Sequence, residues 1–525
     1  LGGEGTFSNT NALDLNNASS KLLLSSSITV GKVSTSLASL GLDVDDDSTV
    51  SSLSVAHTTP VSIASGKTLS GAITVTAGSI KLGEVGTLGA TVTMSGGTLD
   101  ADETLTLSGA LTQSGAITID VAENKYLFYT GAAVSLGAYT LTMSGEGTFS
   151  NSNALDLNNA SSKLLLDSIT VAKVSTSLAS LGLDVDDDST VTSLSVAHTT
   201  PISIASTKTL SGAITVTAGS IKLGEAGTLA SSVSMSGGTL DADESLTLSG
   251  ALTQAGAITI DVADNKTLTY SGDEISLGAY TLTMSGEGTF SNTNALDLNN
   301  ASSKLLLSSS ITVDNVSTSL TSLGLDVDED STVSSLTVAH TTPVSIASGK
   351  TLSGAITVTA GSIKLDEAGT LGSTVSMSGG TLDADESSTV SGALSHTANI
   401  TIDVAEDKTL TYSGTAISLG AYTLTLTGGG NLVSGGMTLN DADSKLLLNS
   451  ITVDSVSTSA NNSGLDVDDD STVTSLTVGH TTPVSIASTK TLSGAVTVTA
   501  GSIKLGETGT LASTVSMSGG TLDAD

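Results

Sequence analysis

The sequence predicts an all-β fold: a right-handed parallel β-solenoid with coils of about 20 residues and seven coils in each repeat of about 141 residues. Three observations predict this fold, namely long tandem repeats, apolar residues that alternate with polar ones, and a scarcity of aromatic residues. Aromatic residues make up 2% of the 525 residues and Trp is absent. A large rounded core is therefore not expected.

Near-copies of one long segment run through the chain. The phrase GEGTF begins at Gly3, Gly145 and Gly286, and a degenerate counterpart, GGGNL, begins at Gly428. We divide the chain into copies over 1–144, 145–285 and 286–427 and a partial copy over 428–525, forming one continuous solenoid without linkers. Such duplication favours a function that scales with length.

A shorter period lies inside each copy. Thr-Leu or similar pairs restart a strand-like run seven times within one repeat, at intervals of unequal length. These restarts predict the seven coils. They are Thr68, Thr87, Thr104, Tyr126, Thr140, Lys163 and Thr190, and Thr209 then begins the next round.

Apolar residues alternate with Thr, Ser or Lys inside these runs, as in Ile73 and Val75 or Ile80 and Leu82. Period-two alternation is typical of strands with one buried face, and the Gly residues between them are typical of turns. One coil buries too few side chains to fold alone, so we expect coils to stack by parallel pairing. A string of immunoglobulin-like sandwiches is the competing architecture, although such domains usually rest on large aromatic residues.

The segments TLTLSGALTQSGAITI (104–119) and TLTMSGEGTFSN (140–151) resemble the coils of repetitive bacterial surface proteins. These are the β-helical passengers of autotransporters, filamentous-haemagglutinin-like adhesins and very long exported repeat proteins. The resemblance covers essentially the whole chain and is compositional. It implies an exported, cell-surface or extracellular rod that attaches a cell to a surface, a neighbour or a matrix.

Two acidic segments are the candidate metal sites. The spacing D-x-D-x-D in GLDVDDDST supplies the hard oxygen donors that calcium loops use, although the last ligand of an EF-hand is missing. Its residues are Asp43, Asp45 and Asp47, then Asp184, Asp186 and Asp188, then Asp326, Asp328 and Asp330, and finally Asp466, Asp468 and Asp470. The segment TLDADE adds Asp100, Asp102, Asp241 and Asp243.

We expect Asp120 to lie one coil after Asp100 at the equivalent corner, and likewise Asp14 to lie one coil before the segment that starts at Asp43. Stacked carboxylates repel one another. They therefore extend into water, pair with Lys21 and Lys125, or hold calcium, and the sequence leaves all three open.

The sequence predicts no catalytic site. His57 and its counterparts each precede Thr-Thr-Pro, which indicates a turn rather than a metal site. Ice binding is a further alternative, because outward T-x-T pairs such as Thr104 and Thr106, followed by Thr140 and Thr142, can order water. Interruptions of this ladder by Tyr126 and Phe128 argue against it.

Charge and composition limit the classes of binding partner that we expect. The formal net charge is −35, there is no Cys, and no run approaches the ~18 apolar residues of a membrane span. Nucleic acid is therefore not an expected partner. The prediction is an extracellular structural protein that assembles with itself, head to tail or laterally, and that contacts surface polysaccharide or matrix as an adhesin in the alternative.

Overall fold

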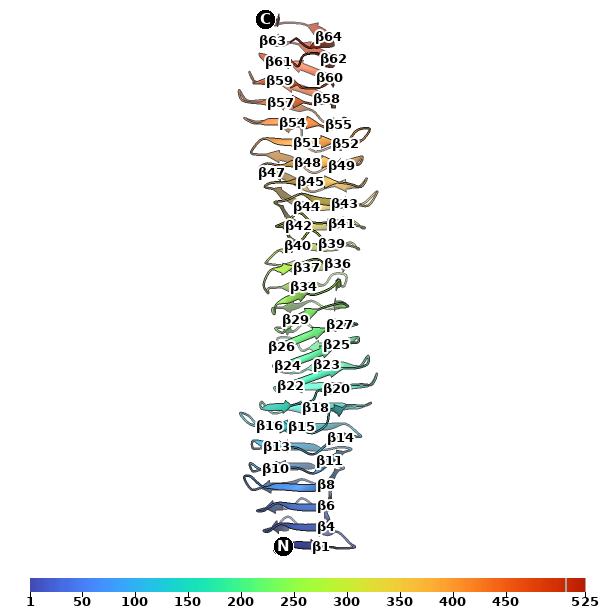
Figure 1. Ribbon diagram of the computed structural model, residues 1–525, viewed down its shortest axis with the longest axis vertical. Coiled ribbons are helices and arrows are strands. Elements are labelled where there is room, and N and C mark those ends of the chain that lie inside the picture. Colours follow the sequence, from blue (N-terminus) through green and yellow to red (C-terminus); the bar gives the residue numbers. More distant parts are fainter. Residues whose placement is uncertain (506–507, 525) are drawn as a thin grey trace. The chain divides into compact units, whose positions relative to one another are not determined.

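The computed structural model describes residues 1–505 and 508–524, and every regular element among them is a β-strand. The chain winds in about 26 coils of roughly 20 residues whose strands pair in parallel, which confirms the predicted β-solenoid. It divides into two compact units: Leu1–Ile258 with Lys266–Asp273, and Thr259–Asn265 with Glu274–Asp525. Figure 1 labels the strands along the chain.

Each coil of the first unit contributes to two sheets, which we call sheet A and sheet B. Sheet A receives either one long strand or two short strands from a coil, and sheet B receives one strand. The strands of sheet A begin with β1 (Gly5–Phe7), β2 (Leu13–Leu15), β4 (Ile28–Thr35), β6 (Ser48–Val55), β8 (Thr68–Val75), β10 (Thr87–Leu88), β11 (Thr91–Met94), β13 (Leu105–Leu107), β14 (Leu111–Gln113), β16 (Tyr126–Tyr129), β17 (Val134–Ser135), β19 (Thr148–Asn151), β20 (Leu155–Leu157), β22 (Thr170–Thr176), β24 (Ser189–Val196) and β26 (Thr209–Val216).

Sheet B runs beside it with one strand per coil. Its strands begin with β3 (Lys21–Leu24), β5 (Gly41–Val44), β7 (Thr59–Ile63), β9 (Ser79–Leu82), β12 (Thr98–Ala101), β15 (Ile117–Val121), β18 (Thr140–Ser144), β21 (Lys163–Asp167), β23 (Gly182–Val185), β25 (Thr200–Ile204) and β27 (Ser220–Leu223).

Parallel register places equivalent side chains of successive coils beside one another. Ile80 of β9 lies opposite Leu99 of β12, which in turn lies opposite Ile119 of β15. These three side chains are fully buried. The alternating pattern therefore produces continuous columns of aliphatic side chains inside the solenoid.

The long strands of sheet A are two short strands joined in the middle. The first half of β8 pairs with β10 and the second half pairs with β11. Gly71 lies at the junction with φ +118°, and a Cβ there would meet the Val50 carbonyl oxygen at 1.9 Å. Only glycine fits this close approach, which occurs where the register shifts between Val50 and Leu53.

The structure corrects the predicted division into coils. Tyr126 lies opposite Thr148 in sheet A, whereas Thr140 lies opposite Lys163 in sheet B. Tyr126 and Thr140 therefore belong to one coil, and counting them as the starts of two coils is wrong. The sequence pattern alone does not distinguish the two sheets, because both use Thr-Leu pairs.

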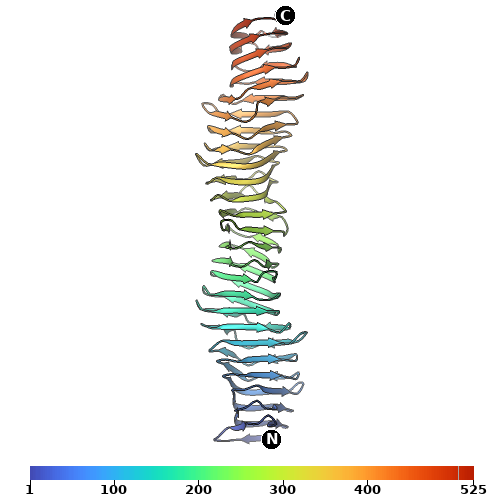
Figure 2. The same ribbon diagram turned by 180° about the vertical axis from the view of Figure 1, so that it is seen from behind.

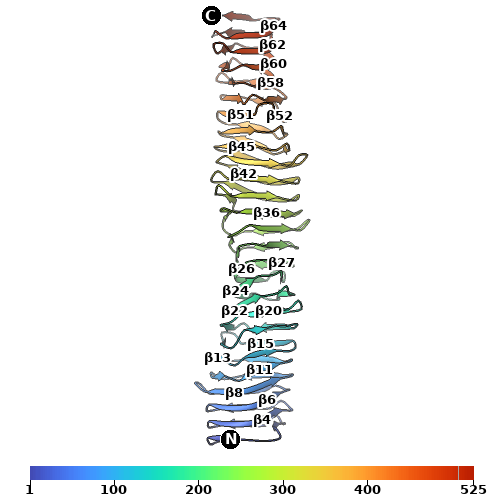
Figure 3. The ribbon, with the colours of Figure 1, turned by 45° about the vertical axis from the view of Figure 1, so that its right-hand side comes forward.

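The second unit has the same organisation. Its paired strands include β38 (Leu296–Leu298), β40 (Thr312–Thr318), β42 (Ser331–Val338), β44 (Thr351–Val358), β47 (Thr374–Met377) and β50 (Leu394–His396) on one sheet, and β39 (Lys304–Leu307), β41 (Gly324–Val327), β43 (Thr342–Ile346), β45 (Ser362–Leu365), β48 (Thr381–Ala384) and β51 (Ile400–Val404) on the other. Figures 2 and 3 show the stacked coils of each unit from two other sides. Over the described residues, no helix has the length and apolar character needed to cross a membrane.

Candidate functional site

The DVDDD segment bridges the end of one strand and the start of the next. Asp43 lies on β5 with its side chain outward, whereas Asp45, Asp46 and Asp47 occupy the turn before β6. Alternate residues share a face only while the chain stays extended. The strand ends after Val44, so the three candidate carboxylates separate.

A lysine of the preceding coil pairs with the strand carboxylate in every copy. Lys21 forms this ion pair with Asp43, and Lys163 repeats it with Asp184. In the second unit, Lys304 pairs with Asp326 and Lys445 pairs with Asp466. Neutralisation by Lys21, one of the three predicted alternatives, is thus what the described side chains do.

The turn carboxylates point toward the following coil. Lys67 Nζ lies 2.7 Å from Asp46 Oδ1, and this hydrogen bond holds the pKa of Asp46 below its usual value. Asp47 accepts the backbone N–H of Thr68 at 2.7 Å. The second copy repeats both contacts, since Lys208 pairs with Asp187 at 2.6 Å and Asp188 accepts the N–H of Thr209.

The TLDADE segment forms a second acidic corner. Lys81 Nζ lies 3.0 Å from Asp100 and 3.3 Å from Asp102, and Lys125 Nζ lies 2.6 Å from Glu103. The equivalent lysine of the second copy, Lys222, lies 2.7 Å from Asp241 and 3.8 Å from Asp243. Each of these lysines therefore connects its own coil to carboxylates of a neighbouring coil.

Asp100 is a largely buried carboxyl group at this corner. It lies opposite Asp120 in register, as predicted, and its side chain is 14% exposed. Burial raises the pKa of Asp100, and the neighbouring Asp102 and Asp120 add to this effect, while Lys81 opposes it. The Ser144 hydroxyl donates to Asp120 at 2.5 Å.

The predicted calcium sites remain a prediction. Among residues 1–505 and 508–524, no group of three or more His, Cys, Asp or Glu side chains converges in a way that could hold a metal ion. In the first copy, Asp43 instead faces a lysine, Asp45 is exposed and Asp47 faces a backbone N–H. Calcium coordination there would require the lysine side chain to move away.

Asp14 lies in the coil before Asp43, as expected, but the expectation that it lies at the equivalent corner is wrong. Asp14 lies on β2 in sheet A, opposite Ser34, whereas the DVDDD strand belongs to sheet B. Its carboxylate accepts hydrogen bonds from the hydroxyls of Ser34 and Ser36 and from the Ser36 N–H. These bonds lower the pKa of Asp14, with the Ser36 hydroxyl contributing most.

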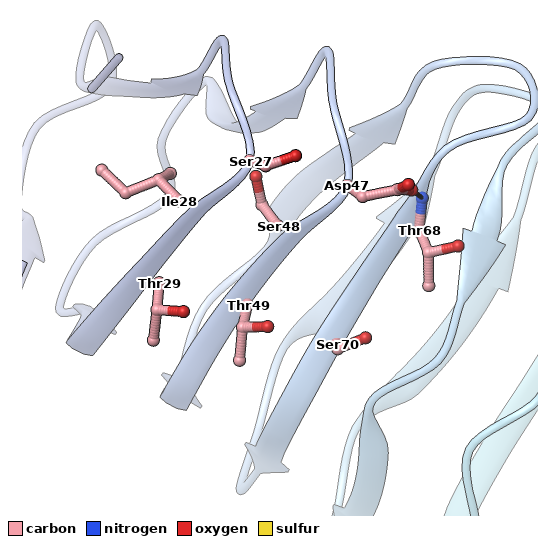
Figure 4. A pocket seen from close by; sticks show the side chains of 8 residues that line it. All are labelled: Ser27, Ile28, Thr29, Asp47, Ser48, Thr49, Thr68 and Ser70. Carbon is pink, nitrogen blue, oxygen red and sulfur yellow. Dashed lines mark hydrogen bonds between the residues drawn. The ribbon is translucent and has the colours of Figure 1, made fainter. Parts of the chain in front are cut away.

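A shallow groove of about 510 Å³ lies where the DVDDD turn enters sheet A. Figure 4 shows the Asp47 carboxylate beside the Thr68 nitrogen at one end, with the hydroxyls of Thr29, Thr49 and Ser70 along the strands. A groove of about 280 Å³ occupies the equivalent place in the fourth copy, with Asp470 in the position of Asp47. The groove is therefore a consequence of the repeat.

The histidines of the four turns are exposed. The carbonyl oxygen of His57 accepts the Thr59 hydroxyl at 2.9 Å, and His198, His340 and His480 repeat this bond with the threonine two positions later. The backbone of these residues thus closes the turn before the strand that contains Pro60 or its counterpart.

A column of hydroxyl side chains, which we call the hydroxyl ladder, was not predicted. It lies on the outer face of sheet A, on the short second strands and on the second halves of the long strands. In the first unit its register runs through Ser34, Ser54, Thr74, Thr93 and Thr112, and again through Ser175, Ser195, Thr215, Ser234 and Thr253. In the second unit it runs through Ser317, Thr337, Thr357, Ser376 and Ser395, and through Thr438, Ser457, Thr477, Thr497 and Ser516.

The T-x-T pairs singled out in the sequence do not form a ladder with one another. Thr106 lies in sheet A opposite Phe128, whereas Thr140 lies in sheet B opposite Lys163. The hydroxyl ladder could have been found from the sequence by aligning the S-L-S-V, A-I-T-V and T-V-T-M segments, which all end a strand on a buried aliphatic residue.

Comparison with known proteins identifies no relative: no family model, no curated protein and no solved structure matches this chain.

Proposed function

We propose that this chain is an extracellular structural repeat protein that serves as a stiff fibre, a sheath component or an adhesin stalk. The main observation behind the proposal is that most of its lysines form ion pairs between successive coils. Among the described residues, fourteen of the 17 lysines form ion pairs with carboxylates that lie one coil away along the chain. Side chains as well as backbone groups therefore connect successive coils.

This arrangement suits a mechanical role. A separating force on two coils acts on a row of parallel backbone hydrogen bonds at once, so the bonds share the load. The ion pairs add a screened contribution of about 0–1 kcal/mol each, because the partners are partly exposed. The remaining negative charge opposes unspecific clumping. The proposal assigns the chain no catalytic activity.

Surface labelling of the source cells tests the proposal. Antibodies against the chain should decorate intact cells or the filaments that they release, without any need to permeabilise the cells. Labelling confined to permeabilised cells would contradict an extracellular structural role. A cytosolic protein labelled in parallel controls for cell integrity.

Self-assembly is a separate part of the proposal. We expect light scattering of the purified chain to show species larger than the monomer as concentration rises, and more of them when magnesium screens the negative charge. A monomer at every concentration, with and without magnesium, would contradict assembly while leaving the surface location untouched.

Ice binding is a second candidate function, and the hydroxyl ladder favours it. Threonine and serine side chains repeat at the ~4.8 Å spacing of paired strands over five successive coils. A thermal-hysteresis measurement tests it. Activity that is lost in Thr74→Lys and Thr93→Lys would support ice binding, and the absence of activity in the wild-type chain would exclude it.

A further inference from the structure

Two aromatic side chains stand on the outer surface of the first unit. Tyr126 and Phe128 point outward from β16, whereas Leu127 and Tyr129 on the same strand point into the core. The exposed fractions of Tyr126 and Phe128 are 45% and 39%. Their rings are nearly parallel, with centroids 5.7 Å apart and an interplanar angle of 9°. We call this pair the aromatic platform.

The fold does not need the aromatic platform. Threonine occupies both positions in the next two copies, as Thr267 and Thr269 and as Thr409 and Thr411, and the strands there keep the same alternation of buried and outward residues. Exposing two large apolar rings costs hydration free energy that threonine avoids. The platform is thus a local departure from an otherwise repeated surface.

Hydroxyl groups border the platform on both sides. Phe128 lies between Thr106 of the preceding coil and Ser150 of the following coil. Tyr126 lies opposite Thr148, and its N–H donates to the Thr104 hydroxyl at 3.2 Å. Two rings that stack on one another and are flanked by hydroxyls combine exposed apolar surface with hydrogen-bonding groups at its edges.

We propose that the aromatic platform binds a neutral polysaccharide. A pyranose ring presents a flat face of C–H groups that can lie against an aromatic ring, and its hydroxyls can bond to the flanking threonines and serine. The platform lies on an open strand surface, which suits an extended polymer. An anionic polymer is disfavoured, because Lys125 beside the platform already pairs with Glu103 and the chain is strongly acidic.

The repeats supply a matched variant for the test. The double substitution Tyr126→Thr and Phe128→Thr, which we call the platform-loss variant, gives β16 the residues that β34 (Thr267–Tyr270) carries at these positions. Circular dichroism should therefore show an unchanged fold. The reverse substitutions, Thr267→Tyr and Thr269→Phe, create a second platform on the same chain.

Sedimentation with insoluble cellulose and chitin measures binding by the full chain, with alginate as the anionic comparison. The wild-type chain should bind cellulose or chitin, the platform-loss variant should bind on the order of tenfold more weakly, and the second platform should strengthen binding. Equal binding by wild type and the platform-loss variant would overturn the proposal. So would binding to alginate alone, or no binding to any of the three.

Light scattering of the same variants distinguishes a polysaccharide from a second copy of this chain. If the platform-loss variant shows reduced self-association and unchanged binding to cellulose and chitin, the platform is a contact between copies and the proposal fails. This inference does not depend on the structural role proposed above, because binding is measured on the isolated chain.

Discussion

Replacing Tyr129 with Phe removes one hydroxyl that connects two coils inside the core. The Tyr129 side chain is 0% exposed, and its hydroxyl accepts the Leu111 N–H at 3.2 Å and donates to the Ala132 carbonyl oxygen at 2.5 Å. The substitution leaves the ring and its packing in place. It also leaves the buried Leu111 N–H without its partner.

The cost should be about 1–3 kcal/mol, which is the usual penalty for a buried donor left unpaired. For a unit of this size the midpoint of thermal unfolding should fall by roughly 2–4 °C per kcal/mol. Circular dichroism follows the unfolding, and hydrogen exchange should accelerate at the Leu111 amide. The exposed Tyr139, replaced by Phe, is the control and should change neither.

The same tyrosine predicts a dependence on alkaline pH. Burial raises the pKa of Tyr129, so the folded state disfavours ionisation relative to the unfolded chain. The resulting stability is complete below pH ~10 and is lost as pH rises through the folded pKa. Tyr129→Phe should weaken this alkaline loss. An unchanged midpoint, an unchanged Leu111 exchange rate and an unchanged alkaline profile would together refute the reasoning.

Four further predictions follow from other contacts. Gly212→Ala should destabilise the first unit by about 2–4 kcal/mol in a urea melt, because its Cβ would meet the Val191 carbonyl oxygen at 1.9 Å at φ +124°; a normal melt would contradict this. Asn151→Ala should cost about 2–3 kcal/mol in the same melt, because this 3% exposed side chain makes three hydrogen bonds to backbone, whereas an exposed Asn→Ala substitution should cost little. The lowered pKa of Asp46 predicts stability that is present above pH ~3.8 and lost as pH falls through its folded pKa, so Lys67→Gln should weaken the dependence of the melting temperature on pH below pH ~3.8. Millimolar calcium should leave the melting temperature of the metal-free chain unchanged if the lysine pairs persist, and a rise would show that the acidic segments bind calcium.

The fold class could be predicted because most strands alternate buried and outward residues, as β15 does. Ile117, Ile119 and Val121 alternate with Thr118 and Asp120, and the structure buries the first three and turns the other two outward. Because aromatic residues are so few, the side chains on the buried faces can fill only a narrow core, which a stack of coils provides. Tandem repetition then supplies neighbours for each coil.

The path of the chain between the two sheets could not be predicted. Thr140 begins a strand that looks in sequence like the one at Thr104, yet the first belongs to sheet B and the second precedes a strand of sheet A. The same difficulty misplaced Asp14. Corners differ in length from coil to coil, so an offset of one coil along the sequence does not specify which sheet a segment joins.

The sequence identified the residues of the acidic segments, but it did not show which side chains they contact. The sequence shows that lysine and carboxylate stand one coil apart, as with Lys163 and Asp184, but only the parallel register shows that they meet. Tyr126 and Phe128 were noticed only as interruptions of a threonine pattern. Their exposure depends on which face of β16 they occupy, which the strand boundaries decide.

A density map of each unit at near-atomic resolution tests the central claim most directly. We predict layers about 4.8 Å apart, each formed by roughly 20 residues, with Lys163 Nζ within hydrogen-bonding distance of Asp184 in the next layer. A map with antiparallel two-sheet domains, or with Lys163 directed away from Asp184, would contradict the account.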